Sequence, residues 1–319
     1  MKKIFILCTC LMSAFQTFAQ INLKDSTALV IAYWCKGEKY NYNYASQTLD
    51  IKGSDTTLIS YSESKFELEV IDSTSNGYLI NYTKLSEAIS IPDENSPLAG
   101  LMKKLANAGN SISITLKTDE SGKFQEIVNF DEYKKQLISQ LEILAREVEN
   151  DLKKAGMKKS EIEAVLLNVL TPFMSDTFIY KTIEHVTSML SFHGKKMKLA
   201  EKYTNAIQIA SPFESGKNLD GELTRYVAEY NPETSWTTFH SITSYNKEQL
   251  KMAVFNYLNS IAPQGQKIAI SEIPQISMDG YTSITVHLDT GWPGYASLLQ
   301  ETAHPDKTRL KRWYIELEL

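Results

Sequence analysis

The sequence of 319 residues has little cysteine: two of its three cysteines, Cys8 and Cys10, lie in the first apolar segment. Cys35 is the third. If the first segment is removed, no intramolecular disulfide can form. Because no partner motif accompanies Cys35, we expect it to be a buried and inert thiol rather than a catalytic one.

The motifs that hold nucleotides, metals or a nucleophilic serine are also missing. Neither Gly-x-x-x-x-Gly-Lys-Ser/Thr nor Gly-x-Gly-x-x-Gly occurs, and there is no Gly-x-Ser-x-Gly elbow. The five histidines show no His-x-x-x-His spacing, so we predict no metal and no cofactor. We expect His185 to be solvated, and His193 to be a cation favoured by the end of a helix.

Basic charge is not in excess. The chain has 33 Lys and Arg, two of them in residues 1–19, against 38 Asp and Glu. A mildly acidic balance argues against binding to nucleic acid or to an anionic membrane surface. After Phe15 no apolar run is long enough to span a bilayer, and no Pro/Ser-rich or Gly-rich linker divides the chain.

The first 19 residues have the layout of a secretory signal. Lys2 and Lys3 precede an apolar run from Ile4 to about Phe15, and small or polar residues follow up to Ala19. We therefore predict a signal peptide at 1–19 and a single α+β domain at 20–319. The product is expected to be exported, to the periplasm, the cell surface or the extracellular space.

Periodicity predicts strands in both flanking thirds and helices between them. Alternating apolar residues predict hairpins around residues 66–82, 112–128 and 222–245, and a last strand from Trp313 to Leu319. In the middle, an apolar stripe at helical spacing begins after Asp131, Ser160 and Glu163 have capping-box spacing, and a third helix ends at Gly194. The stripe is formed by Tyr133, Leu137, Leu141, Leu144, Val148 and Leu152.

We therefore predict an α+β fold: a curved antiparallel sheet from both flanking thirds, with a central helical block at about 131–194 packed on it. The flanks have a similar order of elements. Residues 20–130 and 195–319 could form a pseudo-repeat around a helical insert.

One tripeptide suggests catalysis. The segment "ITVHLDTGWPG" contains Asp289-Thr290-Gly291, the sequence that carries the catalytic carboxylate of aspartic peptidases. Such a site needs a second carboxylate close by, and the chain has no second Asp-Thr/Ser-Gly. Trp292 also stands where a small residue is expected after the motif, and Pro293 after it cannot donate a backbone hydrogen bond. The favoured interpretation is a turn in which the Asp289 carboxylate accepts a backbone hydrogen bond, Gly291 supplies a permissive dihedral angle and Trp292 packs on the sheet.

Aromatic residues provide the candidate binding surface. Tyr40, Tyr42 and Tyr44 share one face of an extended segment, and Trp34 lies upstream. These rings could stack on sugars or line an apolar groove. The alternative is a half-buried strand, where aromatic residues are common without any ligand.

Short segments resemble a family of uncharacterised exported proteins from Gram-negative bacteria, known as a domain of unknown function. They are "FAQ" at the end of the signal, "KGEKYNYNY", "SPLAGLMKKLA", "SITL" followed by "DESGK", and "DTGWPG". The resemblance implies a periplasmic or surface protein without known catalysis. The expected concave sheet also looks like that of open-barrel envelope proteins that shelter lipids.

The leading hypothesis is therefore a non-enzymatic envelope protein that binds an apolar small molecule, such as a lipid, or a partner protein. One alternative is a hydrolase that uses acidic residues, with Asp289 as the suspect. Another is a structural or adhesive surface protein.

Overall fold

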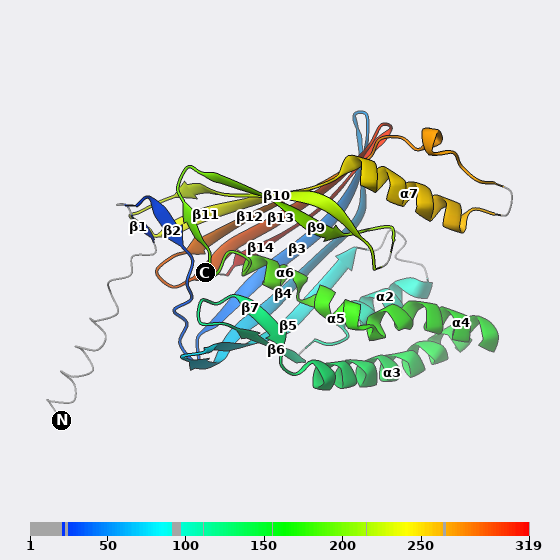
Figure 1. Cartoon of the computed structure of the whole chain (residues 1–319). Helices are drawn as coiled ribbons and strands as arrows, with labels where there is room; N and C mark the ends of the chain where they lie inside the picture. The colour runs from blue at the N-terminus through cyan, green and yellow to red at the C-terminus, as the bar shows by residue number, and fades with distance from the viewer. Residues whose placement is uncertain are drawn as a thin grey trace, which may run out of the picture.

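The computed structural model describes residues 21–22, 25–90, 97–110, 112–154, 156–214, 216–263 and 266–318. The predicted signal peptide and Leu319 lie outside these residues. The predicted α+β class is confirmed: helices and a large curved antiparallel sheet make up most of the described chain (Figure 1).

Both flanks of the sequence contribute to one sheet of eleven strands, as predicted. All neighbouring strands are antiparallel, in the order β7-β6-β5-β4-β3-β14-β13-β12-β11-β10-β9. The N-terminal strands are β3 (Lys39–Lys52), β4 (Asp55–Thr74), β5 (Gly77–Ser90), β6 (Ser113–Thr118) and β7 (Phe124–Ile127). The C-terminal strands are β9 (Lys202–Ala210), β10 (Asn218–Tyr230), β11 (Trp236–Tyr245), β12 (Ser277–His287), β13 (Trp292–His304) and β14 (Lys307–Leu317).

The two flanks meet where β3 pairs with β14, from Tyr42 opposite Leu317 to Ile51 opposite Thr308. A small separate sheet consists of β1 (Ile21–Asn22), β2 (Thr27–Leu29) and β8 (Lys196–Lys198). Helix α2 (Pro97–Asn107) connects β5 to β6, and α7 (Lys247–Ile261) with the short helix η2 (Ile270–Glu272) connects β11 to β12. The proposed pseudo-repeat stays a prediction.

The central block is helical, but its boundaries differ from those predicted. It contains α3 (Phe130–Lys154), α4 (Lys159–Leu170), η1 (Thr171–Met174), α5 (Asp176–Thr182) and α6 (Glu184–Met189). Glu161, not Glu163, forms the capping interaction of α4, because its carboxylate accepts the Lys158 backbone N–H at 3.0 Å. The predicted third helix is broken at Ile183, whose backbone leaves the helical region.

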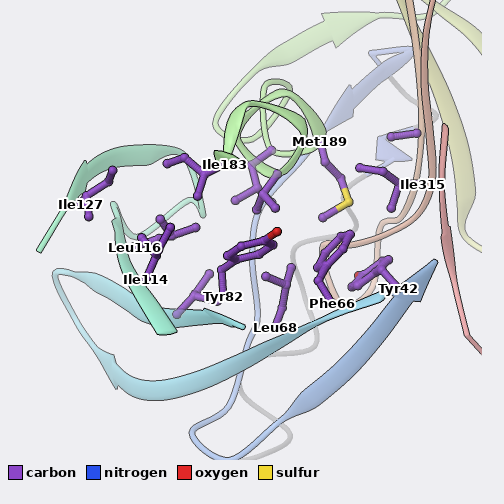
Figure 2. Packing of buried hydrophobic residues seen from close by; sticks show 14 of the residues in the cluster. Tyr42, Phe66, Leu68, Tyr82, Ile114, Leu116, Ile127, Ile183, Met189 and Ile315 are labelled. Atoms are coloured by element: carbon purple, nitrogen blue, oxygen red, sulfur yellow. The ribbon is translucent and has the colours of Figure 1, made fainter. Parts of the chain in front are cut away.

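The helical block covers part of the inner face of the sheet. Figure 2 shows the side chains of Ile183 and Met189 from this block above Phe66, Leu68 and Tyr82 of the sheet. All five are almost inaccessible to solvent. The same core continues across β14 to β12 through Ile315, Ala296 and Ile284, so both flanks share one hydrophobic core.

No single helix among the described residues has both the length and the apolar character needed to cross a membrane. Lys159–Met174 and Asp176–Thr182, bent by 62° at the break between them, meet that test of length and composition only as a pair.

Candidate functional site

The predicted aromatic surface lies in the core. Trp34 and Tyr42 are buried, whereas Tyr40 and Tyr44 are half-buried and pack against the same cluster. The Tyr42 hydroxyl donates to the Pro293 carbonyl at 3.0 Å, and burial raises the pKa of Tyr42. Trp34 stacks on Trp292 with ring centroids 4.5 Å apart. Most of the ring surface of this group therefore contacts protein.

The Asp-Thr-Gly segment forms the turn between β12 and β13, and His287 pairs with Trp292. Gly291 has φ of +77° and lies against the backbone of Ile31 and Ala32. Asp289 is exposed, and its carboxylate accepts the Ser235 hydroxyl at 2.7 Å rather than a backbone N–H of the turn. Within the described part of the chain, no hydrogen bond or ion pair joins Asp289 to a second carboxylate.

Three expectations for single residues are wrong. Cys35 is exposed, because it begins the turn between the buried residue Trp34 and β3. His185 is buried, because the break at Ile183 turns it toward Tyr44, Phe66 and Tyr82.

His193 is also buried and is not a helix-end cation. It follows α6 in a turn, and its Nε2 lies 2.8 Å from the Gly291 carbonyl. Burial lowers the pKa of His193 to about 4, so the ring is neutral near pH 7. A neutral ring donates one hydrogen bond, and the short Gly291 contact identifies Nε2–H as that donor.

A cavity of about 440 Å³ lies on the inner face of the sheet between two groups of helices. On one side, α5 and α6 contribute Lys181, Glu184 and His185 to its wall. On the other side, α7 packs against β10 and β12 through a small cluster centred on Leu250 and Met278. The inner face of β11–β14 lies between them and forms the floor (Figure 1).

The side chains of the floor change from apolar to polar along the strands. Nearest the core it presents Trp313 and Leu298, and Tyr44 closes that end. One register step further out, Thr243, Gly280 and Gln300 lie side by side on three neighbouring strands, followed by Lys311 on β14. The cavity therefore has an aromatic inner end and a polar outer end.

Charged side chains of both signs lie at the outer end. Lys181 and Lys311 provide two cations, and Glu184 provides an anion. Within the described part of the chain, none of these three residues forms an ion pair with another side chain. They are therefore available to a polar group that carries no net charge or charges of both signs.

His185 belongs to the aromatic end. Its imidazole lies 4.7 Å from Tyr44 and 5.0 Å from Phe66, measured between ring centroids. Burial lowers the pKa of His185 to about 3, with a smaller effect from the nearby Lys84 cation, so the ring is neutral near pH 7. Among the described residues its buried Nε2 has no hydrogen-bond partner, and the imidazole ring lies roughly perpendicular to the rings of Phe66 and Tyr82.

The structure gives no sign of a metal centre in the chain segments it describes: no three His, Cys, Asp or Glu side chains there are grouped to hold an ion.

Sequence reasoning missed the cavity, although one signal was present. The inward positions of β12 are Met278, Gly280, Thr282, Ile284 and Val286, so the apolar series is interrupted by a glycine and a threonine. A strand that is covered along its whole length would keep that series apolar. The interruption marks the uncovered part of the inner face.

No family model matches the chain, and no curated protein matches it. A solved structure that concerns lipid–protein interactions in lipovitellin superposes with a TM-score of 0.44 and 9% sequence identity. The superposition covers 89% of this chain and 25% of the lipovitellin chain, so this chain spans about a quarter of that protein's length. At this level of similarity nothing about the lipovitellin ligand transfers to this chain. The resemblance to a family of exported proteins stays a prediction.

Proposed function

We propose that the protein binds one small amphipathic molecule in the cavity between α5–α6 and the sheet. The observation that carries the proposal is the uncovered inner face between two packed groups of helices, with aromatic and polar ends. A volume of about 440 Å³ lies within the usual range for a site that holds a single small ligand.

Each end of the cavity fits one part of such a molecule. Trp313, Leu298 and Tyr44 offer apolar and aromatic surface, which an alkyl or ring group would bury. At the outer end, Gln300 and the unpaired charges of Lys311 and Glu184 suit a neutral or zwitterionic polar group. A wholly apolar ligand would remove water from these polar groups without replacing their hydrogen bonds, which is unfavourable.

Gly280 offers a way to block the cavity without disturbing the fold. It lies on the floor, and among the described residues a Cβ placed there meets only Thr243, at ordinary contact distances of 3.8 and 4.0 Å. We expect Gly280→Phe to fill the space while the sheet stays folded. Gly280→Ala adds a single methyl group at the same position and serves as the matched control.

The test is calorimetric titration with dodecylphosphocholine, a single-chain zwitterionic amphiphile, below the concentration at which it forms micelles. We expect the wild type and Gly280→Ala to bind with a negative heat-capacity change, and Gly280→Phe to lose binding. Thermal unfolding at about 100 times the Kd should show a stabilisation of about 2.7 kcal/mol for the first two proteins only. Equal binding by Gly280→Phe, or no binding by the wild type, would contradict the proposal.

Export remains part of the proposal and rests on the signal-like residues 1–19. Cell fractionation, with determination of the N-terminus of the product, tests it: a cytoplasmic product with the first 19 residues intact would exclude export.

A further inference from the structure

The outer face of the sheet, opposite the helices, carries a depression that is separate from the inner cavity. Side chains alternate along a strand, so Ser283 and Ser297 face outward next to the buried Ile284 and Ala296. The two serines are paired in register. Their next neighbours across the sheet are His240 on β11 and Tyr314 on β14. Two small side chains therefore lie between two large ones.

Large side chains also surround the serine pair along the strands. Tyr281 lies two residues from Ser283 on β12, and Tyr295 lies two residues from Ser297 on β13, both on the outer face. Tyr281, Tyr295 and Tyr314 are each about 40% exposed, as aromatic walls of a site would be. The depression has a volume of about 680 Å³.

The depression continues beyond Tyr314. On the next strand, Tyr314 pairs with Ala45, which is followed by Glu63 on β4 and Ala88 on β5. A second depression of about 340 Å³ lies over these residues, and Tyr314 lines both. Counting strand spacings from β11 to β5 gives a trough roughly 30 Å long that runs across the strands, with Tyr314 near its middle.

Hydrogen-bonding groups in the trough are available. Within the described residues, the hydroxyl groups of Ser283, Ser297, Tyr281 and Tyr295 make no hydrogen bond to another residue. His240 is held in place because its Nδ1 lies 3.2 Å from the Tyr226 hydroxyl. Arg312 also lines the trough: its Nε and Nη2 face the side-chain amide of Gln47, and its third guanidinium nitrogen is left for a ligand.

We propose that this outer trough binds an uncharged oligosaccharide. Sugar rings have apolar faces that can lie against tyrosine rings, and hydroxyl groups around their edges that can pair with serine, tyrosine, histidine and arginine. An apolar ligand would leave these polar groups without partners. A polyanion would need more cations than Arg312 supplies to the larger depression. The length of the trough fits a chain of several sugar rings rather than one.

The probes are maltohexaose, cellohexaose and chitohexaose, each compared with its monosaccharide by saturation-transfer NMR and calorimetry. We expect at least one hexasaccharide to bind at least about tenfold more tightly than its monosaccharide, because it contacts both depressions. If none of the three binds the folded wild type at concentrations up to about 10 mM, the proposal is overturned.

Two variants assign binding to the trough. Ser297→Phe places a ring on its floor and Tyr314→Ala removes the wall shared by the two depressions. Each should weaken the hexasaccharide at least about tenfold, while circular dichroism shows a folded protein. Gly280→Phe is the control on the opposite face and should leave saccharide binding unchanged. If both outer-face variants bind like the wild type, or if Gly280→Phe loses saccharide binding, the trough is not the site.

Discussion

Gly291 shows how one residue holds several segments together. Its carbonyl accepts the His193 ring at 2.8 Å, and the preceding carbonyl of Thr290 accepts the Tyr33 N–H at 3.1 Å. The next residue, Trp292, donates its indole N–H to Glu38 at 2.8 Å. The Asp-Thr-Gly turn thus connects the N-terminal segment, the end of the helical block and the sheet.

Gly291→Ala is therefore expected to destabilise the protein. A Cβ would overlap the Ile31 carbonyl oxygen and lie 2.8 Å from the Ala32 Cα, in addition to the positive φ. Urea unfolding should show a loss of about 3 kcal/mol, the sum of left-handed strain and overpacking. Gly53 has a similar φ, and no atom of the described residues lies within 4 Å of a Cβ placed there. Gly53→Ala should therefore cost only about 1 kcal/mol. Equal losses at the two positions would show that the close approach at Gly291 has no energetic effect.

The two buried histidines should make stability depend on pH. Their folded pKa values are lowered from 6.5 to about 3 for His185 and about 4 for His193. Below pH 6.5 protons bind the unfolded chain preferentially. The free energy of unfolding is therefore highest above pH 6.5 and falls as the pH drops toward 4, by about 2 kcal/mol per histidine between pH 6.5 and 5.

His185→Phe separates the two contributions. Phenylalanine keeps a ring among Tyr44, Phe66 and Tyr82 and removes an unpaired nitrogen. We expect stability at pH 7 within about 1 kcal/mol of the wild type, and roughly half of the loss on acidification. Urea denaturation at pH 7 and pH 5 measures both quantities. An identical pH slope in the wild type and the variant would mean that His185 does not titrate as a buried neutral group.

At the scale of elements, features set by local chemistry were predictable. Asn246 caps α7 as its position suggests, because its side chain accepts the backbone N–H groups of Glu248 and Gln249. The hairpin turn at Gly77, where φ is +124°, could also be predicted from the local sequence. The positions of the histidines were not, because burial of His185 depends on the break at Ile183 and on which residues of the sheet lie beneath it.

The candidate sites were less predictable than the fold. Tyr40, Tyr42 and Tyr44 were correctly placed on one face, but periodicity does not show what covers that face. The serine pair of the outer trough depends on β12 and β13 being in register, with Ser283 opposite Ser297. That register is fixed by the turn at Gly291 and by burial of the opposite face, and only the folded sheet shows which small residues become neighbours.

At the scale of the whole molecule, the pairing of β3 with β14 joins the two flanks of the sequence into one sheet. The main core includes Tyr42 and Phe66 from one flank and Ile315 and Ile284 from the other. We therefore expect the backbone amides of β3 and β14 to exchange with deuterium only through global unfolding, with the same free energy as urea denaturation. Amides of β9, at the sheet edge, should exchange faster through local opening. Faster exchange in β3 than in β9 would show that the flanks separate before the sheet unfolds.

The β3–β14 pair can form only after both of its strands have been synthesised. The ribosome makes β3 well before its partner β14, so one edge of β3 stays unpaired until β14 has been synthesised. An unpaired strand edge can recruit strands from other molecules, and contacts between such distant segments form slowly. We expect that the nascent chain needs protection at β3 rather than at the helices, whose hydrogen bonds are local.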